Sequence, residues 1–123
     1  PANLEAEIKQ HPLVSQCVVV GDRRPYLVAL VTLDPEEAST YAKEHGLPDD
    51  PVALASNPDV KASIEAHVEE INKKFARVEQ VKKISILPHD LSQESGELTP
   101  TLKVKRAVVA QKHEDAIEEL YAA

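Results

Sequence analysis

The sequence predicts an α+β fold in which a small antiparallel or mixed sheet, made of a hairpin and a third strand, is covered by helices. Two β-branched apolar segments flank a turn-forming stretch, and a later segment carries apolar residues at helical spacing. The expected elements follow the order helix, hairpin, helix, helix, strand, loop, helix, which is typical of this fold class. Because 123 residues can bury one hydrophobic core, residues 1–123 are expected to form a single domain.

The first predicted elements are a short helix and a β-hairpin. The helix is expected to begin at the capping residue Asn3 and to end before Pro12. Residues 15–20 and 27–33 are rich in β-branched side chains, and the six residues between them carry turn chemistry, so these segments are expected to pair. Alternate residues of the second strand are expected to share one face: Leu27, Ala29, Val31 and Leu33.

Two helices are expected after the hairpin. Asp34 is placed to cap the first of them, Pro35 suits its first position, and Gly46 is placed to end it. Residues 47–56 are then expected to form a connector. The second helix is expected to begin at Asn57, and its apolar residues form one stripe: Val60, Ile64, Val68, Ile71 and Phe75.

The last third of the chain is predicted to contain a strand, a long loop and a helix. Residues 81–87 form the expected third strand. Residues 88–101 carry no secondary-structure signal, and loops of this length in compact domains are usually functional or disordered. Residues 104–122 are expected to form one helix with three core-facing residues, Val108, Ile117 and Leu120.

The composition argues against several classes of protein. A net charge of -7 argues against a nucleic-acid binder, and one Phe, three Tyr and no Trp leave few platforms for stacking bases. No apolar run approaches the roughly 20 residues of a membrane span, and no signal peptide is visible. Cys17 lies inside an apolar run and is expected to be a small buried hydrophobe, which fits a reducing compartment.

No complete catalytic constellation is visible. The sequence has no glycine-rich phosphate cradle and no zinc spacing, so no metal site is expected, and the five histidines are expected on helix surfaces and turns. Two basic clusters remain, Arg23-Arg24 at the hairpin tip and Lys103-Val104-Lys105-Arg106 after the long loop. The residue types alone favour solvated surface charge over a site for each cluster, although a hairpin tip is also a place where a rigid scaffold presents contacts.

A resemblance favours the site at the second cluster. The segment from Gly96 to Arg106, GELTPTLKVKR, resembles the carboxy-terminal domain of adenylate-forming (ANL superfamily) enzymes, specifically the long-chain fatty-acid CoA ligases. The stretches LEAEIKQHPLV, VVVGDRRPYLVALV and VKKI resemble the helix, hairpin and third strand of that domain in the same order. The likeness covers essentially the whole chain.

The resemblance implies the cap domain of a bacterial-type ligase, with the large amino-terminal domain, which binds ATP and the acid, missing from residues 1–123. In that family the fatty-acid carboxylate attacks the α-phosphate to give an acyl adenylate and pyrophosphate; the cap then rotates and the CoA thiol attacks. ATP with Mg, CoA and fatty acid would be substrates of the complete enzyme, and the amino-terminal domain would be this domain's partner. The isolated fragment would bind no cofactor and would be inactive.

The resemblance also assigns residues. Lys103 is the lysine expected to enter the active site for adenylation, with Gly96, Thr99 and Arg106 in support. Glycine commonly precedes this lysine in the wider superfamily, whereas the long-chain branch tends toward Leu102 as here. The CoA phosphates are expected to meet basic residues at the hairpin tip and at the end of the long helix: Arg23, Arg24, Lys73, Lys74 and Arg77.

Two alternatives stay open. One is a stand-alone α+β interaction or ligand-binding module whose long loop binds a partner. The other is the cap of a fatty acyl-AMP ligase, which passes its acyl group to a carrier protein. The resemblance implies a cytoplasmic enzyme, with peripheral membrane contact open through the larger domain.

Overall fold

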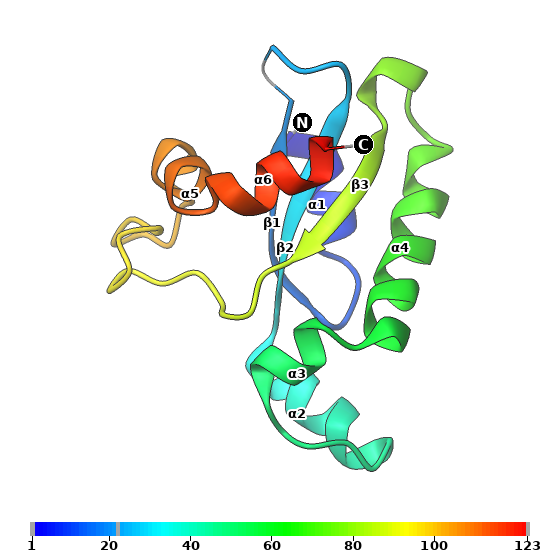
Figure 1. Ribbon diagram of the computed structural model, residues 1–123, viewed down its shortest axis with the longest axis vertical. Helices are drawn as coiled ribbons and strands as arrows, with labels where there is room; N and C mark the ends of the chain where they lie inside the picture. Colours follow the sequence, from blue (N-terminus) through cyan, green and yellow to red (C-terminus); the bar gives the residue numbers. More distant parts are fainter. Residues whose placement is uncertain (1, 22, 123) are drawn as a thin grey trace.

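A three-stranded mixed sheet of order β1-β2-β3 organises the domain (Figure 1). We describe residues 2–21 and 23–122 from a computed structural model. β1 (Val14–Val20) runs antiparallel to the central strand β2 (Leu27–Leu33), and β3 (Val81–Ile86) runs parallel to β2. The predicted α+β fold, with a hairpin and a third strand, is confirmed.

Helices cover both faces of the sheet, as Figure 1 shows. They are α1 (Ala2–Ile8), α2 (Pro35–Glu44), α3 (Pro51–Ala55), α4 (Pro58–Asn72), α5 (Arg106–Lys112) and α6 (Glu114–Tyr121), with the 3₁₀ turn η1 (Arg77–Glu79) before β3. Residues of α1 to α4 pack on one face, and residues of α5 and α6 pack on the other. Within residues 2–21 and 23–122, none of these helices has the length and apolar character to cross a membrane.

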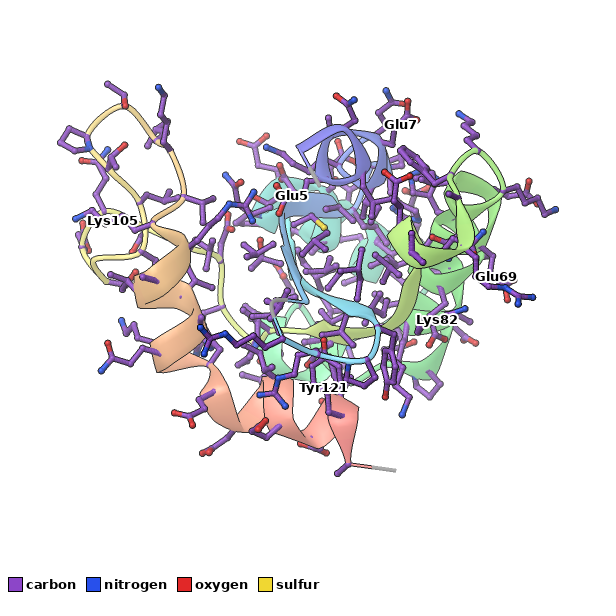
Figure 2. All side chains as sticks on the ribbon, turned by 90° about the horizontal axis from the view of Figure 1, so that it is seen from above. Glu5, Glu7, Glu69, Lys82, Lys105 and Tyr121 are labelled. Atoms are coloured by element: carbon purple, nitrogen blue, oxygen red, sulfur yellow. The ribbon has the colours of Figure 1, made fainter. Side chains whose placement is uncertain are left out.

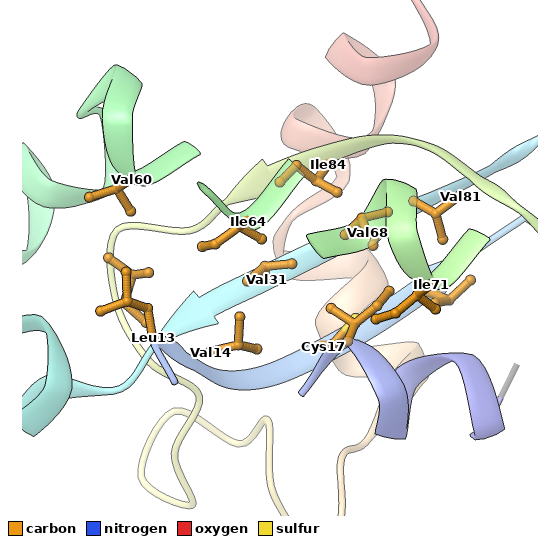
Figure 3. Packing of buried hydrophobic residues seen from close by; sticks show 14 of the residues in the cluster. Leu13, Val14, Cys17, Val31, Val60, Ile64, Val68, Ile71, Val81 and Ile84 are labelled. Carbon is orange, nitrogen blue, oxygen red and sulfur yellow. The ribbon is translucent and has the colours of Figure 1, made fainter. Parts of the chain in front are cut away.

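The larger core lies between the sheet and α4 (Figure 3). The predicted stripe meets β2 and β3 there, and its four members on α4 are buried: Val60, Ile64, Val68 and Ile71. Its fifth member, Phe75, lies beyond the end of α4 and packs half-buried against the same core. The predicted face of β2 also packs into this core. Because β2 is central and covered on both sides, Val28 and Leu30 on its other face are equally inaccessible.

Helix starts follow the predicted caps. The Asp34 carboxylate accepts the backbone N–H groups of Glu36 and Glu37 at 2.9 and 3.2 Å, and the Asn57 side chain plays the same role for α4. Gly46 follows α2 with a φ of +64°, a left-handed conformation that glycine adopts without a steric penalty.

Two sequence predictions in the first half of the chain were wrong. Asn3 does not cap α1, which begins at Ala2, so Asn3 lies within its first turn. The expected connector, residues 47–56, contains α3, because Asp50 accepts the N–H of Val52 and the buried side chain of Leu54 anchors the turn to the core. A single helical turn carries too little periodicity to be recognised from sequence.

The final helix differs from its prediction as well. It starts at Arg106, because Val104 is held in an antiparallel bridge with Leu98, and it breaks at His113 into α5 and α6. Val109 is fully buried where Val108 was expected, because at 3.6 residues per turn Val109, and not Val108, lies on the same side as Ile117. Ile117 is buried as predicted, while Val108 and Leu120 are half-buried.

Cys17 lies in the larger core with 4% of its surface exposed, as predicted. Burial, reinforced by the nearby Glu5 carboxylate, raises the pKa of the Cys17 thiol to about 12. We expect iodoacetamide at pH 8 to leave the folded domain unlabelled and to modify Cys17 once urea unfolds it, because only the thiolate is reactive. Rapid labelling without urea would contradict the buried position.

Candidate functional site

Lys103 stands on a small closed turn at the end of the long loop. The bridge between Leu98 and Val104 closes the turn, and inside it the Thr99 N–H donates to the Lys103 carbonyl at 2.8 Å. The Lys103 N–H donates in return to Thr99 Oγ1 at 3.0 Å. These bonds hold the Lys103 backbone on both sides, so Thr99 supports this lysine directly.

The side chain of Lys103 is exposed. In the part of the chain that the structure describes, no carboxylate lies within 4.0 Å of its ammonium group. The turn projects from the domain beside α5 (Figure 1), and Figure 2 shows the adjoining segment around Lys105 at the periphery. A cation on a hydrogen-bonded turn, free of a partner of opposite charge, can meet an anion brought to it from outside.

The residue before this lysine has an unusual backbone. Leu102 has a φ of +63° and is 60% exposed, so an apolar side chain occupies a left-handed position in solvent. Such a conformation costs a side-chain-bearing residue roughly 1–2 kcal/mol. Glycine would adopt it freely, which gives a physical reason for the glycine common at this position in the wider superfamily.

Gly96 lies at the base of the loop with a φ of +81°, and its N–H donates to the Gln93 carbonyl at 3.0 Å. The left-handed conformation there is again one that glycine adopts freely. Gly96 therefore shapes the turn that precedes the Lys103 segment.

Arg106, the first residue of α5, joins this segment to the core. Its guanidinium donates through two nitrogens to the two carboxylate oxygens of Glu5, on α1, and this hydrogen bonding raises the pKa of Arg106. Glu5 Oε2 also accepts the backbone N–H of Val19 at 2.7 Å. Glu5 was missed in the sequence, where it has only the pattern of a first-turn carboxylate.

A second carboxylate lies at the base of the loop. Glu97 is 5% exposed, and its carboxylate oxygens meet Ser95 Oγ and His113 Nε2, each at 2.5 Å. The expectation that all five histidines lie at surfaces and turns was therefore incomplete, because His113 is half-buried against this carboxylate. No local pattern links residues 97 and 113.

Glu97 makes stability dependent on pH. Burial alone raises the pKa of Glu97, but the hydrogen bonds from Ser95 and His113 and the charges of His113 and Lys112 outweigh it, so its pKa falls below 4.5. Its ionised form therefore stabilises the fold above pH 4.5, and that contribution is lost as the pH falls through the lowered value. Thermal unfolding should show Glu97→Gln less stable at pH 7 and approaching the parent toward pH 3; a constant difference would contradict this.

The residues predicted to meet CoA are not at the Lys103 turn. Arg24 binds both oxygens of Glu118, at 2.6 and 2.9 Å, and its guanidinium lies 4.6 Å from the centre of the Tyr121 ring. Lys73, directly after α4, pairs with Glu70 of that helix, and Lys74 pairs with Glu7 of α1. Arg23 and Arg77 are exposed, and Figure 1 places the β1–β2 turn and η1 at one end of the domain.

Comparison with known proteins identifies the domain. Residues 1–123 match the family described as the AMP-binding enzyme C-terminal domain. The chain belongs to this family. It is 43% identical over 98% of its length to the long-chain-fatty-acid–CoA ligase FadD15 of Mycobacterium tuberculosis, and 36% identical over 94% to the human long-chain-fatty-acid–CoA ligase 6. It spans 20% and 17% of those two proteins.

Solved structures agree with the family. The adenylation domain of a carboxylate reductase from Mycobacterium chelonae superimposes with a TM-score of 0.76 at 26% identity, covering 99% of this chain and 18% of that one. The A-PCP didomain of a carboxylic acid reductase from Segniliparus rugosus, in complex with AMP, gives 0.74 at 27% identity, covering 98% and 16%. The resemblance inferred from GELTPTLKVKR is thus confirmed at the level of family and fold.

Proposed function

We propose that this domain is the cap of a long-chain fatty-acid CoA ligase and that Lys103 serves its adenylation step. The complete enzyme would convert ATP, as its magnesium complex, fatty acid and CoA into acyl-CoA, AMP and pyrophosphate through an acyl adenylate. The observation that carries the proposal is the exposed Lys103, which has no ion-pair partner among residues 2–21 and 23–122, on a turn whose backbone bonds to Thr99 on both sides. The 43% identity to a ligase of this class supports the substrate assignment.

Lys103 suits the charge change of that step. As the fatty-acid carboxylate attacks the α-phosphate, negative charge gathers between the two groups, and an ammonium group on a flexible stem can lie between them. Because Lys103 has no carboxylate to release among the described residues, moving it into such a site breaks no ion pair. Rotation of the cap would then remove Lys103 and admit the CoA thiol.

The test uses the complete reading frame and residues 1–123 alone. The complete enzyme, supplied with ATP, magnesium, palmitate and CoA, is expected to release pyrophosphate and form palmitoyl-CoA. As part of the same proposal, we assign this enzyme to the cytoplasm, with peripheral membrane contact through its larger domain. Residues 1–123 are expected to do neither, because the proposal assigns ATP and the acid to the larger domain. Pyrophosphate release by the isolated domain would refute the assignment of ATP and acid binding to the larger domain.

We also propose that CoA phosphates meet the basic residues at the end of the domain that carries the β1–β2 turn and η1. Arg23 and Arg77 are exposed there, while Arg24, Lys73 and Lys74 hold acidic partners that CoA would have to displace. Replacing Arg23, Arg24 or Arg77 by Glu is expected to raise the KM for CoA by about two- to fivefold and to leave the KM for ATP unchanged.

The matched control for Arg24 is Glu118→Gln. This change removes the ion pair with Arg24 but keeps the arginine charge, so it should not raise the KM for CoA. If Arg24→Glu and Glu118→Gln act equally, the effect comes from the lost pair and CoA contact at Arg24 is refuted. An unchanged KM in all three Arg→Glu variants would remove the CoA proposal.

A carrier-protein thiol is the second candidate, after CoA, for the group that accepts the acyl chain from the adenylate. The carboxylate reductase adenylation domain superimposes better, at a TM-score of 0.76, than a Mycobacterium tuberculosis fatty acyl CoA synthetase does, at 0.54. Supplying the complete enzyme with either CoA or a phosphopantetheinylated carrier protein separates the two. Acyl transfer to CoA alone would support the ligase, and transfer to the carrier alone would support the alternative.

A further inference from the structure

The segment that carries Lys103 is tied to the domain at both ends. Residues 98–104 form the closed turn, Glu97 precedes it and Arg106 follows it. At the far end, Arg106 binds Glu5 of α1. At the near end, Glu97 binds His113, at the junction of α5 and α6.

Glu97 holds both sides of the base of this turn. Its side chain meets Ser95 and His113, while its backbone carbonyl accepts the Lys105 N–H at 2.8 Å. Lys112 adds a further link, because its ammonium donates to the Ser95 carbonyl at 2.7 Å. A shift of Glu97 would therefore move the chain segments before and after Lys103 together.

His113 provides a fixed reference point. It ends α5 and precedes α6, and these helices are anchored on the sheet by Val109, at 0% exposure, and Ile117, at 4%. The Lys103 turn is anchored at its base, where Leu98 is buried in the same cluster as Val109 and Ile117, while Leu102 at its tip is exposed. The direction of the turn is thus set at its base.

From this geometry we infer that Glu97 and His113 are a positioning pair, which holds the Lys103 turn at a set orientation to the sheet. Neither side chain is bonded to Lys103, so the pair acts through the backbone of residues 97–105. The inference rests on the proposed adenylation role of Lys103 for its catalytic consequence. Its structural part, restraint of the turn, is independent of that role.

The experiment uses four variants of the complete ligase. Glu97→Ala and His113→Ala remove the pair, and His113→Gln keeps a side-chain donor that can still reach the carboxylate. Asp34→Ala is the matched control, because it removes a helix cap, at about 1 kcal/mol, on an element remote from the Lys103 turn (Figure 1). The readouts are amide exchange of residues 98–105 and the kinetics of each half-reaction.

We expect both alanine variants to accelerate amide exchange in residues 98–105 by about tenfold or more, which corresponds to about 1.4 kcal/mol of lost protection. The kcat of acyl-adenylate formation should fall by about 10- to 100-fold, with the KM values for ATP and fatty acid and the thioester step unchanged. His113→Gln should restore most of both losses, and Asp34→Ala should show neither.

Two outcomes would overturn the inference. Unchanged exchange in residues 98–105 of both alanine variants would show that the pair does not restrain the turn. A fall in adenylation of equal size in Asp34→Ala would show that general destabilisation is the cause. If exchange rises while Lys103→Ala itself leaves adenylation intact, the proposed function fails and the restraint stands.

Discussion

Replacing Lys103 by alanine in the complete ligase is expected to slow acyl-adenylate formation by about 10²- to 10³-fold, the usual cost of removing one group that stabilises transition-state charge. Thioester formation from supplied acyl adenylate should continue at the parental rate, because in the proposed mechanism the rotated cap no longer presents this lysine. Pyrophosphate release measures the first step, and CoA consumption with synthetic palmitoyl adenylate measures the second.

Lys105→Ala is the matched control for this result. It removes an exposed cation two residues away without changing the backbone N–H that bonds to Glu97. It should leave both half-reactions unchanged, which separates the position of Lys103 from the net charge of the segment. Equal loss of both half-reactions in Lys103→Ala would refute the assigned role.

Replacing Glu5 by alanine is expected to give the largest loss of stability among the polar changes considered. The Val19 N–H would lose its acceptor in a buried strand, and Arg106 would lose both hydrogen bonds to α1. An unsatisfied buried donor costs about 1–3 kcal/mol, and the half-exposed Arg106 adds less because water can solvate it. We expect a total loss of about 2–3 kcal/mol in urea unfolding of residues 1–123.

Glu5→Gln tests which of the two contacts matters. Its amide oxygen can still accept the Val19 N–H, while the charged pair with Arg106 is lost. We expect this variant to lose about half as much stability as Glu5→Ala. A parental stability for Glu5→Ala would contradict the role of Glu5 as the link between α1, β1 and α5.

Local chemistry predicted most of the fold. The helix starts at Asp34 and Asn57, the stop at Gly46 and the β-branched strands depend on neighbours a few residues apart, and the structure contains all of them. The missed helix α3 is also local, but a single turn carries too little periodicity to be recognised. The late start of the last helix has a different cause, because Val104 is held in a bridge with Leu98.

In the candidate site, too, some residues could be predicted from a continuous segment of sequence and others could not. The resemblance identified Lys103, Thr99 and Gly96 from one continuous segment, because a turn and the residue it presents are encoded together. Glu5 and His113 carry no such signal. Glu5 lies 101 positions from its partner Arg106, and His113 lies 16 positions from its partner Glu97, so only the folded chain brings these side chains together.

By itself, then, the sequence determined the fold class and the family and made Lys103 the candidate lysine, since these depend on periodicity, caps and a contiguous motif. Only the tertiary structure decided how that lysine is held and which basic residues already have partners. The physical reason is that contacts such as Glu5–Arg106 and Glu97–His113 require two side chains to meet at hydrogen-bond distance. That distance is set by the packing of helices on the two faces of the sheet, which no local pattern of residues encodes.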